Sequence, residues 1–115
     1  MNDKPIDELV AEKVMGWIKP PETSILKSMW VETPIGAVHP QLPKFSENMQ
    51  DAWLVVEKFD FANVERVTGY GDAFYRVNIS VAQIDGTYSD IEVKAPTAPM
   101  AICIAALKAV GEEWQ

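Results

Sequence analysis

The sequence is poor in the residues that build disulfide scaffolds and metal sites. Its 115 residues include one cysteine, Cys103, and one histidine, His39. A disulfide framework needs paired cysteines, and a structural zinc site needs ligands that are mostly Cys or His. We therefore predict no metal and no cofactor. Cys103 is predicted to be a small core residue, and His39 a loop residue satisfied by water or backbone.

Positive charge and long apolar runs are also scarce. Ten Lys and Arg residues stand against seventeen Asp and Glu, so the formal net charge is -7 at pH 7. Duplex nucleic acid needs a basic surface and is excluded as the main partner. The longest apolar stretch, residues 100–110, is too short to cross a bilayer and contains Lys108. Without a signal-peptide pattern, we expect one soluble cytoplasmic domain over residues 1–115 and no membrane partner.

Catalytic motifs are missing as well. The chain has no Walker or nucleophile-elbow pattern, and Gly69–Gly71 precedes a predicted strand instead of the helix that a phosphate loop needs. These glycines fit a connection between two strands. The acidic residues Asp3 and Asp7 fit solvated charges at a helix end. We therefore predict that the protein is not an enzyme and has no catalytic residues.

Three stretches have the apolar spacing of helices. The first runs from Pro5 to Trp17, and the third from Ala98 to Val110 with Thr97 as cap and Gly111 as stop. The second begins at Ser46, its predicted N-cap, and ends near Lys58. Its apolar face consists of Met49, Ala52, Trp53, Val56 and Phe59.

Between the second and third helices the period changes to that of strands. Residues 74–81 alternate apolar and polar side chains, which predicts a half-buried strand. Further strands are predicted at 63–68 and, after the hairpin signal Asp85–Gly86, at 88–93. We predict an α+β fold in which three helices cover a small, mainly antiparallel sheet. The apolar strand set, expected to pack against Trp53 and Val56 or against Ile102 and Leu107, is Tyr75, Val77, Ile79 and Val81.

Residues 19–45 are rich in both proline and large apolar side chains. The prolines prevent a long helix, and the apolar content is too high for a solvated linker. We predict an ordered, partly buried segment with a short strand at 29–32.

The polar side of the central strand supplies the candidate site. Phe74, Arg76, Asn78 and Ser80 share one face at period two, and we place Arg66 of the neighbouring strand within their reach. A ring, guanidinium groups and an amide could bind the base and phosphate of a nucleotide. The alternative is that these residues form the solvated face of a half-covered sheet.

Stretches from one end of the chain to the other carry a family resemblance. They are Leu9–Trp17, Trp30 with Pro34–Gly36, Leu42–Ser46, Ala52–Lys58 and Ala95–Leu107. In residues and order they resemble the phage ABA sandwich family, small proteins of phages and prophages of Gram-positive bacteria. The family name implies an α-β-α sandwich with helices on both faces of a central sheet. It also implies a phage protein in the cytoplasm of an infected or lysogenic bacterium.

Two functions remain open at this point. The phage context of the resemblance implies a non-enzymatic counter-defence protein that sequesters a small nucleotide immune signal, as a homo-oligomer. Phe74, Arg76, Asn78 and Arg66 would bind that nucleotide. The alternative is a phage accessory or structural protein without a small-molecule ligand, whose exposed tryptophans, such as Trp30 and Trp114, form a protein interface.

Overall fold

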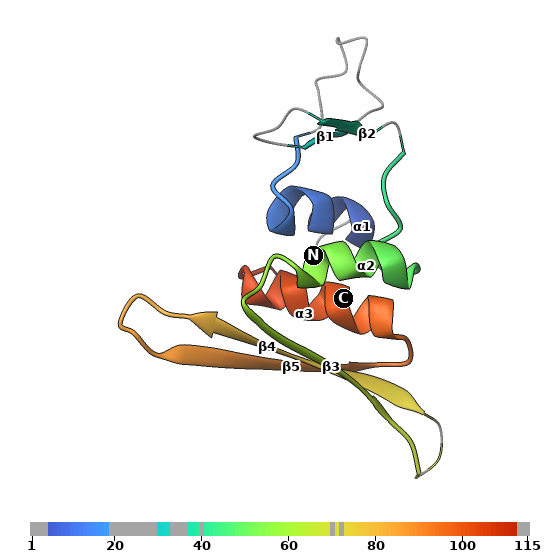
Figure 1. Cartoon of the computed structure of the whole chain (residues 1–115), viewed down its shortest axis with the longest axis vertical. Coiled ribbons are helices and arrows are strands. Elements are labelled where there is room, and N and C mark those ends of the chain that lie inside the picture. Colours follow the sequence, from blue (N-terminus) through green and yellow to red (C-terminus); the bar gives the residue numbers. More distant parts are fainter. Residues whose placement is uncertain are drawn as a thin grey trace.

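The computed structural model describes residues 5–18, 30–32, 37–39, 41–69, 71 and 73–112. In chain order the elements are α1 (Ile6–Leu9), η1 (Val10–Val14), β1 (Trp30–Glu32), β2 (Ala37–His39), α2 (Met49–Val56), β3 (Phe61–Val67), β4 (Phe74–Ala82), β5 (Tyr88–Ala95) and α3 (Ala98–Ala109). The π-helical turn η1 continues α1. Figure 1 shows the small β1–β2 sheet at one end, the helices in the middle and the β3–β4–β5 sheet beyond them.

The larger sheet is antiparallel throughout, with β4 between β3 and β5. Both of its turns use glycine with positive φ. Gly69 and Gly71 lie in the β3–β4 connection, and Gly86 lies in the β4–β5 turn. In that second turn, Gln83 donates its backbone N–H to the Thr87 carbonyl oxygen over 2.7 Å. The predicted α+β class, the antiparallel sheet and both turns are confirmed.

Helix α3 lies directly on the sheet and forms the centre of the core. Val77 and Ile79 of β4 are fully buried on the side that faces it. Ile102 and Leu107 of α3 are buried as well, which confirms the α3 alternative for the packing partner of the strand. The helix has no charged residue before Lys108, because it is enclosed by other elements along most of its length.

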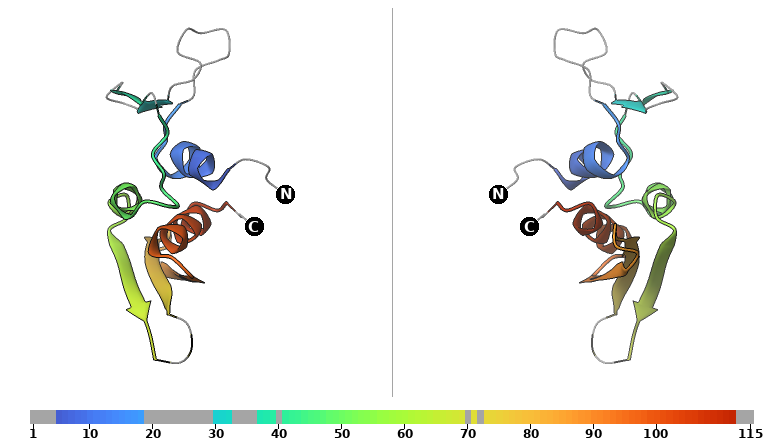
Figure 2. Two further views of the ribbon diagram at one scale, coloured as in Figure 1. Left: turned by 90° about the vertical axis from the view of Figure 1, so that its right-hand side faces the viewer. Right: turned by 90° about the vertical axis from the view of Figure 1, so that its left-hand side faces the viewer.

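The remaining helices pack on the side of α3 that faces away from the sheet (Figures 1 and 2). Helix α2 contributes Ala52 and Val55, both fully buried, to this layer. The buried Ser46 donates its backbone N–H to Asp7 Oδ1 over 2.9 Å, which joins α1 to the segment before α2. Asp7 is therefore a structural acceptor and not a solvated charge, while Asp3 lies outside the described residues.

Within the described residues, the helices thus lie on one side of the three-stranded sheet. The described helices and the two small antiparallel sheets are consistent with the predicted sandwich. The elements α1, η1 and α2 pack on α3 and not on the far face of the three-stranded sheet. That far face is left without a cover from the described helices.

Helix α2 differs from its prediction in both its start and its buried face. It begins after Asn48, whose side-chain oxygen accepts the backbone N–H of Asp51 over 3.1 Å, so Asn48 is the N-cap and Ser46 is not. Trp53 is 49% exposed and does not pack on the strand. The apolar arc of α2 is wider than its contact with α3, and the small side chain of Ala52 takes the contact position.

The first helix is shorter than predicted, because Gly16 (φ +74°) turns the chain out of the helix before Trp17. Trp17 is buried just beyond the end of the helix, where its ring packs against Phe45. Burial of Phe45 and Trp30 confirms the predicted ordered packing of 19–45 for those two residues. Residues 19–29, 33–36 and 40 lie outside the described part.

Candidate functional site

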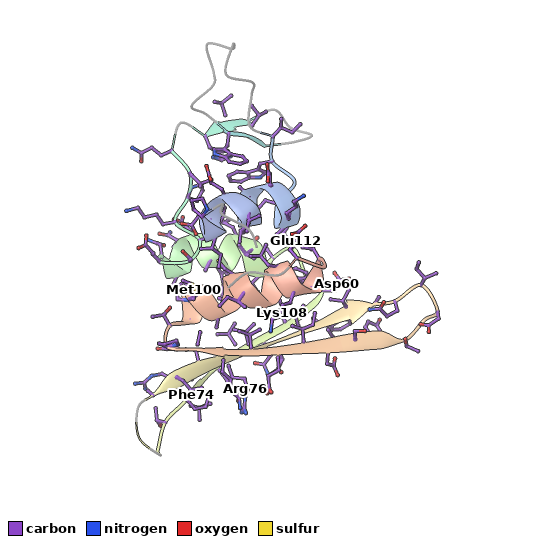
Figure 3. The ribbon with its side chains drawn as sticks, turned by 180° about the vertical axis from the view of Figure 1, so that it is seen from behind. Asp60, Phe74, Arg76, Met100, Lys108 and Glu112 are labelled. Carbon is purple, nitrogen blue, oxygen red and sulfur yellow. The ribbon has the colours of Figure 1, made fainter. Side chains whose placement is uncertain are left out.

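The far side of the three-stranded sheet carries the predicted site residues. Directly opposite residues of antiparallel strands point to the same face, so the strand pairing defines this surface, which we call the open face. Its members are Phe61, Asn63, Glu65 and Val67 of β3, Phe74, Arg76, Asn78, Ser80 and Ala82 of β4, and Tyr88, Asp90, Glu92 and Lys94 of β5. Figure 3 shows Phe74 and Arg76 pointing away from the helices.

Arg76 is engaged by carboxylates from both neighbouring strands. Its Nε donates to Glu65 Oε1 over 2.5 Å, and its Nη2 is paired with the same oxygen. Glu92 Oε1 lies 3.7 Å from Nε on the other side. Arg76 thus forms a three-charge cluster with Glu65 and Glu92 whose own net charge is negative, and Lys94 lies directly opposite Arg76 on β5. The sequence pattern predicted the arginine but not the two carboxylates, since neither is close to it along the chain.

Phe74 and Asn78 have the places on this face that period two predicted. The Phe74 ring lies under Lys94 Nζ, which is 5.9 Å from the ring centroid. Asn78 is half-buried in the middle of the sheet, between Asn63 and Glu92. The structure therefore brings Phe74, Arg76 and Asn78 together on one face, as predicted.

Arg66 is on the opposite face, so its predicted place beside Arg76 is wrong. Arg66 lies opposite Tyr75 in the strand pairing, one residue along from the Glu65–Arg76 pair, and successive residues of a strand point to opposite faces. Its side chain lines a separate hollow of about 580 Å³ beside the start of α3, with Tyr75 and Thr97. The face of a strand residue depends on the register, which the connection between β3 and β4 sets, and a shift by one residue exchanges the two faces.

A shallow depression of about 530 Å³ lies at one end of the open face. It is lined by Asp60, Phe61, Ala62, Asn63, Asn78, Ser80 and Asp90. Asp90 accepts a hydrogen bond from the Ser80 hydroxyl over 2.6 Å. The described lining thus contains two carboxylates and no Lys or Arg, a charge that disfavours phosphate.

Two aromatic side chains at this end of the sheet are mostly exposed. Phe61 is 55% exposed and Tyr88 57% exposed, and their rings meet edge to face at 5.7 Å. The sequence prediction missed both residues, because it began β3 at residue 63 and treated Tyr88 only as the start of a strand. Phe61 lies two residues before Asn63, and Tyr88 lies two residues before Asp90. This period-two spacing puts both rings on the open face and is the signal that could have identified them.

The other candidate residues that the structure describes are buried or stack against a neighbouring ring. Burial raises the pKa of the Cys103 thiol well above its ordinary value, with a smaller effect from the charge of Asp7, which fits the predicted core residue. His39 lies in β2 and not in a loop, and its ring stacks on Trp17 with the centroids 4.2 Å apart. Trp30 is buried, so its predicted exposure at an interface is wrong. Trp114 is outside the described residues.

The described residues contain neither a metal-binding cluster nor a helix suited to span a membrane. No three His, Cys, Asp or Glu side chains among them lie together in a way that could hold a metal ion. In the same residues, no helix has the length and hydropathy to span a membrane.

The comparisons with known proteins identify a family. No curated protein and no solved structure matches the chain. The family profile of the phage ABA sandwich domain, in contrast, matches residues 8–107. This match covers the end of α1, all of η1, both sheets, α2 and most of α3. The chain therefore belongs to the phage ABA sandwich domain family.

Proposed function

We propose that this protein is a non-enzymatic phage accessory protein that acts by binding a protein partner through the open face of its sheet. The observation that carries this proposal is the engagement of Arg76 by Glu65 and Glu92. A nucleotide phosphate at Arg76 would have to displace a carboxylate and would then lie beside both negative charges. The open face is thus poorly suited to sequester a nucleotide immune signal.

The same face has the composition of a protein-binding surface. Protein interfaces are enriched in aromatic side chains and arginine, set among polar groups. Phe61 and Tyr88 expose more than half of their surfaces here, and Arg76 lies on the central strand β4. The face is also broad, since the described part of the chain places only a shallow depression on it. A protein surface can cover such a face, whereas a small ligand needs a deeper hollow.

Site-specific photo-crosslinking tests this proposal. A photoreactive amino acid is placed at Phe61 on the open face or, as a matched control, at Trp53 on α2, which is exposed to a similar degree. In bacterial cells that express the protein, we expect a discrete protein adduct from position 61 and none from position 53. Adducts from both positions or from neither would contradict the proposal.

Calorimetry with a panel of cyclic and linear nucleotides tests the competing hypothesis. We expect no binding by the folded protein. Binding that Arg76→Ala abolishes would overturn the protein-binding proposal and support nucleotide sequestration. Binding that this substitution leaves intact would place a nucleotide site elsewhere and would also remove the argument for a purely protein-binding role.

A further inference from the structure

From the charge pattern of the open face, we infer that its protein partner is a second copy of this chain, docked face to face with its strands antiparallel. This inference rests on the proposed function and names the partner. The described helices all lie on the other side of the sheet (Figures 1 and 2), so a second copy can approach the open face without meeting them.

The open face is divided into rows of residues that lie side by side across the strands. The rows that matter here, in order along the sheet, are Glu65–Arg76–Lys94, Asn63–Asn78–Glu92 and Phe61–Ser80–Asp90. The first row has one carboxylate and two cations, the third has one carboxylate and no cation. The face therefore has a positive side and a negative side, and the middle row separates them.

A two-fold axis that runs along the middle row makes these two sides complementary. Such an axis lies between the two sheets, places each strand over its own copy and reverses the order of the rows. Lys94 and Asp90 are on the same strand, two residues to either side of Glu92. Each Lys94 therefore comes opposite the Asp90 of the other copy, which produces two symmetry-related ion pairs.

The remaining residues fit the same arrangement. Arg76 comes opposite Ser80, and Phe61 comes opposite Glu65, whose carboxylate is already held by Arg76. Glu92 lies near the axis and approaches its own copy. That repulsion is offset by Arg76, whose Nε is 3.7 Å from the Glu92 carboxylate within each chain. The Arg76 and Glu92 side chains of both copies then lie together near the axis, and each Arg76 also holds Glu65 of its own chain.

The size of the face sets the strength we expect. Nine residues of β4 and three strands give a surface of roughly 30 Å by 14 Å. This is at the small end of specific interfaces, and the charge of -7 on each copy opposes association. We therefore expect a dimer with a dissociation constant in the micromolar range, and not an obligate dimer.

Sedimentation equilibrium at physiological salt, over roughly 1–500 μM protein, tests the inference. The wild type is expected to pass from monomer to dimer within this range. Lys94→Glu and Asp90→Lys should each weaken the dimer at least tenfold, because each places like charges opposite one another. The double variant should restore association, because it exchanges the two charges and recreates the pairs. Lys44→Glu, which makes the same charge change beside α2, should have no effect.

Every result of this experiment bears on the inference. A folded wild type that stays monomeric overturns it, and so does a dimer that Lys94→Glu does not weaken. Failure of the double variant to regain association, with circular dichroism showing a native fold, would exclude the antiparallel arrangement. A monomeric protein whose position-61 crosslinks lead to another protein would reject this partner while leaving the proposed function in place.

Discussion

The two faces of the three-stranded sheet come from the same strands, but different interactions hold their side chains. On the covered face, Val77 and Ile79 are buried under α3 as part of the hydrophobic core. On the open face, Arg76 is held by ion pairs and Ser80 by a hydrogen bond to Asp90. Alternation along one strand therefore produces two surfaces. Hydrophobic burial stabilises the covered face, whereas ion pairs and hydrogen bonds hold the side chains of the open face.

The largest difference in stability between the two faces is expected from substitutions at two neighbouring residues of β4, Ile79 and Ser80. Ile79→Ala removes a fully buried side chain, and we expect it to lower the free energy of unfolding by about 2–5 kcal/mol. Ser80→Ala, one residue away on the open face, should cost no more than about 1 kcal/mol, because its hydrogen bond is exposed. Urea titration of both variants makes the measurement. Similar losses at the two positions would contradict the division into a covered and an open face.

A smaller loss of stability is expected from a substitution at Gly111, at the C-terminal end of α3. Gly111 has φ +85°, its N–H donates to the Lys108 carbonyl oxygen, and the N–H of Glu112 donates to that of Leu107. These bonds form the C-terminal cap of α3. Gly111→Ala should lower the unfolding free energy by about 1 kcal/mol.

The added Cβ of Ala at this position would meet no described neighbour within 4 Å, so the cost comes from the backbone conformation alone. Gly111→Asn is the matched control, because asparagine tolerates positive φ better and should lose less. Thermal unfolding followed by circular dichroism ranks the three proteins. An equal loss for Ala and Asn would show that the positive φ is not the cause.

The ion pairs of the open face are expected to contribute still less to stability. Arg76→Ala removes pairs that are partly exposed to solvent, and we expect a loss below about 1 kcal/mol. The loss should shrink in 1 M salt, because mobile ions screen exposed charges. Urea titrations at low and high salt provide the comparison. A salt-independent loss of several kcal/mol would mean that the guanidinium belongs to the core.

The smallest effect concerns the β4–β5 turn. The Thr87 hydroxyl and, to a lesser degree, the Thr87 backbone N–H hold the pKa of Asp85 below its ordinary value of 3.8. A lowered pKa in the folded state means that the contribution to stability is present above pH 4 and is lost as the pH falls through the folded pKa. The melting temperature of the wild type should fall slightly more than that of Asp85→Ala between pH 5 and pH 2. Parallel curves for the two proteins would rule out this contribution.

The sequence predicted the bounds of the central strand and of the last helix well, but it predicted less well which residues contact one another. The strand at 74–81 and the helix at 98–110 were found within one residue at each end, because an alternating pattern and a glycine stop are local signals. Trp53 was misplaced because an apolar arc on a helix shows which side turns inward, but not which of its residues makes contact. The candidate site was predicted in part, with Arg66 assigned to the wrong face.

The sequence by itself determined the α+β class, the antiparallel sheet and the set of side chains that share each face of β4. Only the tertiary structure decided that α3 is the helix that covers the apolar face of β4, and that Glu65 and Glu92 hold Arg76. The physical reason is that period-two alternation is a property of a single strand, whereas neighbours across a sheet depend on the register. The register is fixed when the strand backbones pair on either side of their turns. The carboxylates of Glu65 and Glu92 therefore come next to Arg76 only once β3, β4 and β5 have paired.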